Sequence, residues 1–135
     1  MTMTLTGQIE VRHPLAGEVP AELVAGFEAL PIDLEWQWVL VVDGGVEAQM
    51  LCAPMHGLLA ILRLTAFPST PAAWLVRFLR SVLADSHSRG MIGYVTFLSD
   101  ANPMELKLMR IVQRSGGMLL PSSGAWAFGS TEVRY

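Results

Sequence analysis

The spacing of hydrophobic and polar positions predicts a helix and then a strand in the middle of the chain. Over residues 71–90, apolar residues recur every three to four positions, and Arg77 and Arg80 fall on the opposite side. Residues 92–98 are rich in β-branched and aromatic residues, which is typical of a strand buried on both faces. This helix and this strand form the frame around which the other elements are arranged.

Residues that favour helix ends are found at both ends of this helix. Thr70 offers a hydroxyl that can cap it, Pro71 suits the first helical position, and Gly90 suits the end. After the strand, the Asp-Ala-Asn-Pro sequence at residues 100–103 predicts a turn into a second helix, which ends at residues 115–117. A strand with a helix before it and after it indicates a sheet that is covered by helices.

The remaining patterns predict strands and one more helix. The expected elements are a strand at 8–12, a helix at 19–30, strands at 36–42, 46–53 and 58–67, and short strands at 118–120 and 125–128. An Asp-Gly pair at residues 43–44 predicts a tight hairpin, because it supplies the positive φ angles that such a turn requires. The element order predicts an α/β protein with a mixed, mostly antiparallel sheet flanked by helices, in a single domain over residues 1–135.

Composition narrows the class of protein. Hydrophobic residues make up 52% of the 135 residues, charged residues only 16%, and the mean hydropathy is +0.42. The longest uncharged apolar runs, at 36–42 and 50–62, are shorter than the ~20 residues of a membrane-spanning helix, so no membrane association is expected. We expect no signal peptide and therefore a cytoplasmic protein. The low charge favours apolar surface covered by a partner, either in a homo-oligomer or in a larger protein assembly.

The net charge and the positions of the histidines and the cysteine argue against a nucleic-acid partner and against a metal site. The net charge of −3, without a basic stripe, argues against nucleic acid as a partner. The histidines His13, His56 and His87 lack the spacing of metal ligands, so no metal is expected, and His56 beside a glycine is expected to be a turn residue. The single cysteine, Cys52, is expected to be a small buried hydrophobic residue.

Residues 36–130 resemble the GNAT (N-acetyltransferase) superfamily in the order of their elements and motifs. The shared order is a long helix, Ser-Arg-Gly, a strand, Asp-x-Asn-Pro, a helix, Gly-Gly and a strand. In that family an asparagine after the fifth strand lies beside the pantetheine arm of acyl-coenzyme A, and Asn102 matches this position. The resemblance implies a GNAT-like fold in which the fourth and fifth strands, here residues 59–67 and 92–98, separate to form a groove for acetyl-CoA or CoA.

The resemblance also implies a set of cofactor-binding residues. The fourth strand offers backbone groups to the pantetheine amides, and the start of the next helix holds the pyrophosphate. These positions are Leu64, Thr65, Ser69, Thr70, Ala72, Ala73 and Asn102. The pyrophosphate loop is degenerate: Phe67 stands where the family has Arg or Gln, Thr70 replaces a glycine, and Pro71 removes one amide donor.

The resemblance leaves the catalytic residues unknown. The family often has a tyrosine seven residues after the asparagine, and here that position is Met109, which cannot donate a proton. Tyr94 is the nearest aromatic hydroxyl in the sequence, and packing in the core is expected for it. The candidates for a general base by residue type are Glu47, His56, Asp100 and Glu105, and their spacing selects none of them.

Two functions follow from this reading. The first is an acyl-CoA-dependent N-acyltransferase with a degenerate cofactor loop. The second is a catalytically inactive GNAT-fold protein with a structural or interaction role. Residues 102–129 resemble small GNAT-like proteins associated with the particles of tailed bacteriophages, including the apolar residue where the enzymes have tyrosine. In that case the protein belongs to a virion.

Overall fold

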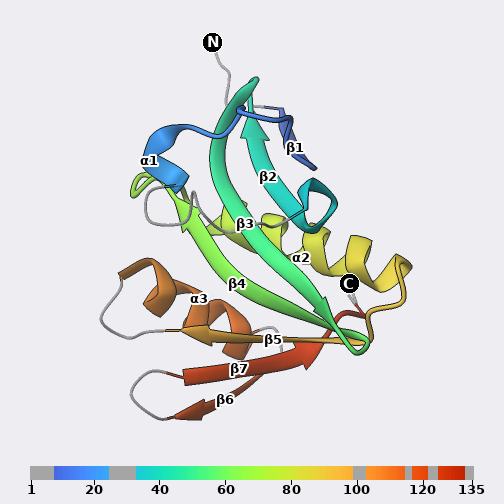
Figure 1. Ribbon diagram of the computed structural model, residues 1–135. Helices are drawn as coiled ribbons and strands as arrows, with labels where there is room; N and C mark the ends of the chain where they lie inside the picture. The colour runs from blue at the N-terminus through green and yellow to red at the C-terminus, as the bar shows by residue number, and fades with distance from the viewer. Residues whose placement is uncertain (1–7, 25–32, 99–102, 115–116, 122–124, 133–135) are drawn as a thin grey trace.

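The computed structural model describes residues 8–24, 33–98, 103–114, 117–121 and 125–132 (Figure 1). The elements are β1 (Ile9–Arg12), α1 (Ala21–Val24), the short 3-10 helix η1 (Leu34–Trp36), β2 (Gln37–Val42), β3 (Gly45–Met55), β4 (Leu58–Ala66), α2 (Ala72–Ser88), β5 (Gly93–Leu98), α3 (Pro103–Arg114), β6 (Met118–Pro121) and β7 (Ala125–Ser130). One sheet has the strand order β1-β2-β3-β4-β5-β7-β6. Its strands pair antiparallel except for β4 and β5, which are parallel. The predicted mixed, mostly antiparallel sheet is confirmed.

Two tight hairpins join β2, β3 and β4. Asp43 and Gly44 have φ angles of 51° and 83°, and His56 and Gly57 have φ angles of 51° and 84°. Two-residue loops with positive φ at both positions match the right-handed twist of the flanking strands. The hairpin predicted at residues 43–44 is confirmed, and so is the turn position of His56.

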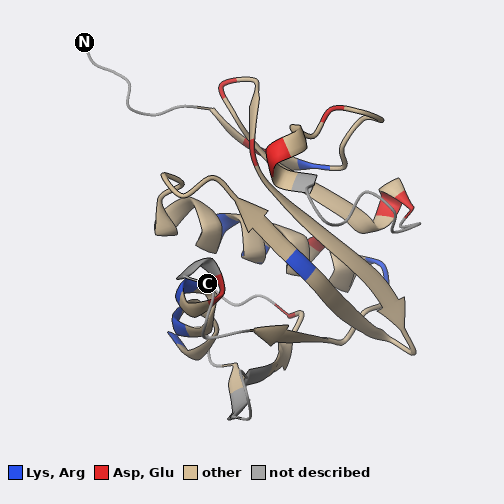
Figure 2. Cartoon of the chain, turned by 60° about the vertical axis from the view of Figure 1, so that its left-hand side comes forward, with Lys and Arg blue, Asp and Glu red and all other residues tan. Residues whose placement is uncertain are grey.

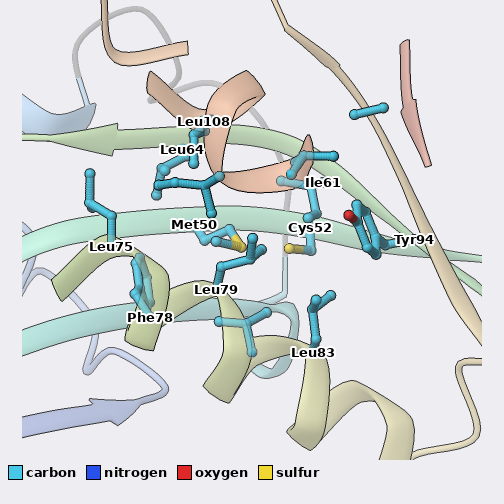
Figure 3. Packing of buried hydrophobic residues seen from close by; sticks show 14 of the residues in the cluster. Met50, Cys52, Ile61, Leu64, Leu75, Phe78, Leu79, Leu83, Tyr94 and Leu108 are labelled. Carbon is cyan, nitrogen blue, oxygen red and sulfur yellow. The ribbon is translucent and has the colours of Figure 1, made fainter. Parts of the chain in front are cut away.

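The main core lies on one face of the sheet, where both α2 and α3 pack. Figure 3 shows side chains of the strands meeting Leu79 and Leu83 of α2 and Leu108 of α3. Cys52 is fully buried in this core, as predicted, and burial raises the pKa of its thiol. Among the described residues, no helix has the length and apolarity that crossing a bilayer requires.

The expectation that the strand at residues 92–98 is buried on both faces is wrong. Tyr94, Thr96 and Leu98 point into the core and are buried, whereas Phe97 on the opposite face is 38% exposed. The reason is that the helices before and after β5 both cover the same face. The short helix α1 lies on the other face, beside β4 (Figures 1 and 2). Of the helix predicted at residues 19–30, the part at 25–30 lies outside the described residues.

Of the two ends of α2, the C-terminal end is as predicted and the N-terminal end is not. Its end is confirmed, because Gly90 has a φ of 95° and its N–H and that of Met91 donate to the carbonyls of His87 and Ser86. Its start is not as predicted, because Pro71 is the N-cap residue and no side chain caps the helix. Thr70 does not act as the cap, since its N–H bonds to the carbonyl of Phe67 in a turn and its side chain is buried.

Candidate functional site

The strands β4 and β5 separate toward their carboxyl ends. Their parallel pairing joins only Leu58–Ile61 to Gly93–Thr96, although β4 continues to Ala66. Figure 1 shows the two arrows diverging from a common start, with α3 between their tips. The separation predicted for these two strands is therefore confirmed.

A β-bulge lies at the point of separation. Cys52 of β3 is paired with Ile61 and Leu51 with Arg63, so Leu62 is an additional residue in β4. A bulge bends its strand and increases the local twist, which carries β4 away from β5. The Thr96 hydroxyl donates to the Ile61 carbonyl at 2.8 Å and closes the last paired position.

The space between the separated ends, which we call the notch, is narrow and mostly apolar. Its free volume is about 20 Å³, which is room for about one water molecule. Among the described residues, it is lined by Met50, Ile61, Leu62, Arg63, Leu64, Leu79, Tyr94, Thr96, Phe97, Leu98, Glu105, Leu108 and Val112. Within the described part of this lining, Glu105 is the only carboxylate.

Two helices begin at the same end of the sheet as the notch. Because β4 and β5 are parallel, their carboxyl ends share one edge, and α2 and α3 start just after them. The unpaired N–H groups of helix starts and the helix dipole favour anions. At the start of α2, Thr70 is 2% exposed and its hydroxyl oxygen has no hydrogen-bond partner among the described residues. A buried hydroxyl without a partner is costly, so this atom marks the start of α2 as a candidate site.

The structure places the predicted cofactor-binding residues around this edge. Leu64 is buried in the notch, and Thr65 is the next residue of β4. The exposed predicted residues near the start of α2 are Ser69, Ala72 and Ala73. Asn102 lies outside the described residues.

The candidate bases are separated by the fold. Glu105 lines the notch, and Asp100 lies outside the described residues. His56 is in the hairpin before β4, at the opposite end of that strand from the notch. Glu47 accepts the Phe67 N–H through its carbonyl and is not part of the notch lining.

The aromatic hydroxyl and the residue at the family's tyrosine position are both buried. Tyr94 is 4% exposed, lines the notch, and packs closely over Gly129. Burial raises the pKa of its hydroxyl, so the hydroxyl stays protonated. Met109 is buried in the same core cluster. The expected packing role of Tyr94 is confirmed.

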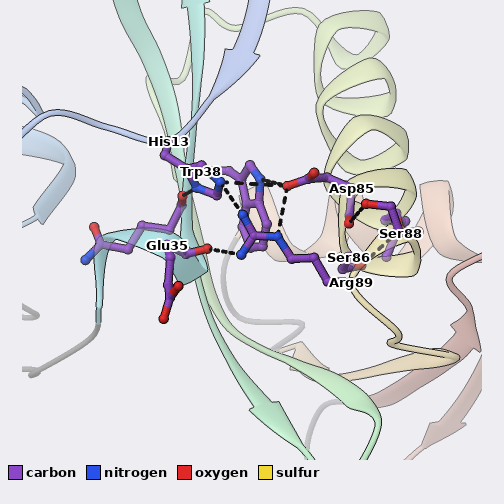
Figure 4. A network of polar contacts seen from close by, with 9 residues as sticks. His13, Glu35, Trp38, Asp85, Ser86, Ser88 and Arg89 are labelled. Atoms are coloured by element: carbon purple, nitrogen blue, oxygen red, sulfur yellow. Dashed lines mark hydrogen bonds and ion pairs between the residues drawn. The ribbon is translucent and has the colours of Figure 1, made fainter.

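A polar network, which sequence reasoning missed, fixes the other end of α2 (Figure 4). The Trp38 indole N–H donates to the Asp85 carboxylate at 3.0 Å, and the Arg89 guanidinium lies 3.7 Å from the same carboxylate. Arg89 also donates to the Glu35 carbonyl at 2.7 Å. These residues come from two stretches far apart in the sequence, at 35–38 and 85–89, so no local pattern indicates that they meet.

His13 joins this network from the segment after β1. Its Nδ1 is 2.8 Å from the Gln37 carbonyl oxygen, and its Nε2 is 2.6 Å from Nη2 of Arg89. Because a carbonyl only accepts and a guanidinium only donates, Nδ1 carries the proton and Nε2 accepts. The described residues contain no group of three or more His, Cys, Asp or Glu side chains placed to hold a metal ion.

Comparison with known proteins relates this geometry to solved structures. No family model matches the sequence, and no curated protein matches it. The ribosomal-protein-S18-alanine N-acetyltransferase of Escherichia coli is similar over 95% of this chain and 97% of its own, with a TM-score of 0.69 and 10% identity. The IAA acetyltransferase of Bacillus cereus is similar over 91% of this chain and 99% of its own, with a TM-score of 0.68 and 9% identity. The chain has the GNAT fold.

A third neighbour was solved in complex with coenzyme A. The PaiA N-acetyltransferase of Thermoplasma acidophilum, in complex with coenzyme A, is similar over 91% of this chain and 99% of its own chain. The TM-score is 0.62 and the identity is 12%. At these identities the likeness establishes the fold, which confirms the predicted GNAT-like architecture. The chemistry of this chain has to be argued from its own residues.

Proposed function

We propose that this protein binds acyl-coenzyme A in the notch and transfers the acyl group to an amine. The observation that carries the proposal is the separation of β4 and β5 after four residue pairs, beside the starts of two helices. The neighbouring structures that share this fold are acetyltransferases, and one of them contains coenzyme A. We place this activity in the cytoplasm, where acyl-CoA is available.

We assign two parts of the described structure to the cofactor. The backbone of β4 from Leu62 to Ala66 has no β5 residue paired with it, which leaves peptide groups for the pantetheine amides. We assign the pyrophosphate to the first turn of α2, at Ala72 and Ala73, and to the neighbouring buried Thr70 hydroxyl. Pro71 has no N–H to contribute. The degenerate loop therefore relies on hydroxyl groups where the family uses glycine N–H groups.

The proton transfers require residues of this chain. Bound acyl-CoA supplies a thioester whose carbonyl carbon is attacked by the acceptor amine. Glu105 is the only carboxylate among the described notch residues, so we propose that it accepts the proton of the attacking amine. The protonated Tyr94 hydroxyl lies within the core, and Met109 offers no proton, so solvent protonates the departing thiolate.

Isothermal titration calorimetry with coenzyme A tests the binding step. Ala73→Glu adds a negative charge at the first turn of α2, where it repels the pyrophosphate, and should weaken binding at least about tenfold. Ala84→Glu is the matched control, because Ala84 is also exposed on α2 but lies near the other end. Unchanged binding by Ala73→Glu, or equal losses in both variants, would contradict a pyrophosphate site at this helix start.

A second function is favoured by the small free volume of the notch. About 20 Å³ between the described residues is far too little for a pantetheine arm unless side chains move apart. A GNAT-fold protein without catalysis, acting as an interaction module or as part of a bacteriophage particle, requires no open notch. Absence of coenzyme A binding at millimolar concentration, in protein that is folded by circular dichroism, selects this second function.

A further inference from the structure

An exposed apolar surface lies on the face of the sheet opposite α2 and α3. The strand register places Val95 beside Phe128, and Phe128 beside Met118, on this face. Phe97 continues the surface along β5, and Leu62 continues it onto β4. We call Leu62, Phe97, Met118 and Phe128 the apolar shelf, and they are 47%, 38%, 72% and 40% exposed. Exposed apolar residues that gather in one area mark interaction sites more often than isolated ones do.

The apolar shelf carries no charge along three of its four strands. No residue of β5, β6 or β7 is Lys, Arg, Asp or Glu, and Figure 2 shows these strands without red or blue. A charged group placed on this surface would lose hydration without gaining a partner. The surface is therefore complementary to an uncharged, apolar ligand.

The apolar shelf is continuous with the notch. Leu62 and Phe97 belong both to the shelf and to the notch lining. On the core side, α3 closes the notch with Leu108 and Val112. A molecule that reaches the notch from the side without helices must therefore cross the shelf. This continuity favours an acceptor substrate over a second copy of the chain.

The size of the shelf indicates how much of the acceptor it contacts. From β4 to β6 the shelf spans three strand spacings, which is roughly 14 Å. An extended peptide rises about 3.4 Å per residue, so about four residues cover this width. A small amine would leave most of the shelf uncovered.

We propose that the acceptor is the amino terminus of a peptide whose first residues are apolar and uncharged. This inference rests on the proposed acyl-transfer function. The terminal amine enters the notch between Leu62 and Phe97, and the following side chains lie on Phe128 and Met118. The amine nitrogen bonds to the thioester carbonyl carbon and the C–S bond breaks. The amine proton passes to Glu105, and the released thiolate takes a proton from solvent.

Binding and transfer are tested separately on the full chain. Two peptides of equal length are each labelled at the carboxyl end. At positions two to four, one peptide has Leu, Val and Phe and the other has only Lys and Glu residues. Fluorescence anisotropy without cofactor measures peptide binding, mass spectrometry with acetyl-CoA measures transfer, and calorimetry with coenzyme A measures cofactor binding. We expect the apolar peptide to bind at least about tenfold more tightly than the charged one.

Substitutions that introduce a charge on the shelf test whether the peptide binds there. Met118→Glu and Phe128→Glu should each weaken binding of the apolar peptide about tenfold, because each places a charge under apolar side chains. Leu106→Glu is the matched control, since Leu106 is 37% exposed but lies on α3. Met118 is 72% exposed, so its substitution leaves the fold intact even where that of Phe128 does not.

The outcomes separate this inference from the proposed function. Equal affinity for the two peptides, or unchanged binding by Met118→Glu, overturns the inference even when coenzyme A binds. Shelf-dependent binding of the apolar peptide together with binding of coenzyme A supports the inference. The same peptide binding without coenzyme A binding contradicts the proposed function, and with it the role of the peptide as acceptor, and leaves only a peptide site on the shelf. A dimer in sedimentation equilibrium that Met118→Glu dissociates, with no peptide bound, overturns the inference and assigns the shelf to a second copy of the chain.

Discussion

The two ends of α2 differ in how their polar groups are satisfied. At the C-terminal end, the N–H groups of Gly90 and Met91 bond back into the helix, and Asp85 accepts the Trp38 indole N–H. At the N-terminal end, no side chain caps the helix and the buried Thr70 hydroxyl has no partner among the described residues. A protein that leaves polar groups unsatisfied at one end and not at the other has a use for them. The comparison points to the N-terminal end as the ligand site and the C-terminal end as the fixed support.

The largest loss of stability is expected at the C-terminal end of α2, which is the fixed support. Asp85→Ala leaves the N–H of the buried Trp38 indole without an acceptor, which should lower the free energy of unfolding by about 2 kcal/mol. Urea denaturation measures this loss. Ser81→Ala, at an exposed position of the same helix, is the control and should be nearly neutral.

A double mutant tests whether the lost Trp38 indole hydrogen bond causes the stability loss of Asp85→Ala. Trp38→Phe removes the N–H donor, so adding Asp85→Ala to it should cost much less than Asp85→Ala alone. Equal costs of Asp85→Ala in the two backgrounds would show that the carboxylate acts mainly through Arg89 or His13.

The next effect is expected at the glycine that ends the helix. Gly90 has a φ of 95°, so Gly90→Ala should cost about 1 kcal/mol of stability through backbone strain. Gly45→Ala is the matched control, because Gly45 has an ordinary φ and an added Cβ meets only the Val42 carbonyl oxygen at 3.7 Å. Thermal unfolding of the two variants should separate them, and a neutral Gly90→Ala would contradict the strain argument.

A smaller change in stability, of opposite sign, is expected at the N-terminal end of α2, which is the proposed ligand site. Thr70→Val replaces an unpartnered buried hydroxyl with a methyl group of similar size, so stability should stay the same or rise by up to about 1 kcal/mol. Coenzyme A binding by the same variant should weaken several-fold, because the hydroxyl is assigned to the ligand. Thr70→Ser, which keeps the hydroxyl, is the control for binding. A clear loss of stability in Thr70→Val would show that the hydroxyl has a structural partner.

The smallest change in stability is expected at the Arg12–Glu18 pair, in the segment that contains His13. Arg12 holds the pKa of Glu18 at about 2, below its ordinary value of 4.5, through hydrogen bonds of which one is 2.8 Å long. Because the folded pKa is depressed, the pair stabilises the protein above about pH 4.5 and loses that contribution as the pH falls toward 2. The pair is on the surface, so the effect is small. Thermal unfolding between pH 5 and pH 2 should show a shallower loss for Glu18→Gln than for the natural protein, and identical slopes would contradict it.

The sequence predicts those features that neighbouring residues determine. The turn at Asp43 and Gly44 and the helix end at Gly90 depend on the conformations that those residues adopt, so composition is enough to find them. The order of elements along the chain predicts the mixed, mostly antiparallel sheet, but the order of the strands within it is known only from the structure. Thr70 was a reasonable cap by type, but the turn that ends at its own N–H directs its side chain inward.

Other features depend on which segments meet. The extra residue Leu62 in β4 exists only relative to its pairing with β3, so no local signal marks the point where the notch opens. The exposure of Phe97 follows from both α2 and α3 packing on one face, which the pattern of residues 92–98 does not reveal. The contact between Trp38 and Asp85 joins positions 47 residues apart. Tertiary pairing therefore decides the candidate site, whereas local sequence decides most of its framework.

Residue-resolved amide hydrogen exchange, with and without coenzyme A, tests the notch most directly. If the cofactor binds along the part of β4 that β5 leaves unpaired, exchange should slow at amides within Leu62–Ala66 and at the start of α2. The amides of Leu58–Ile61, already paired with β5, and those at the end of α2 should be unchanged. Saturating coenzyme A that leaves the amides of Leu62–Ala66 unprotected would contradict the account.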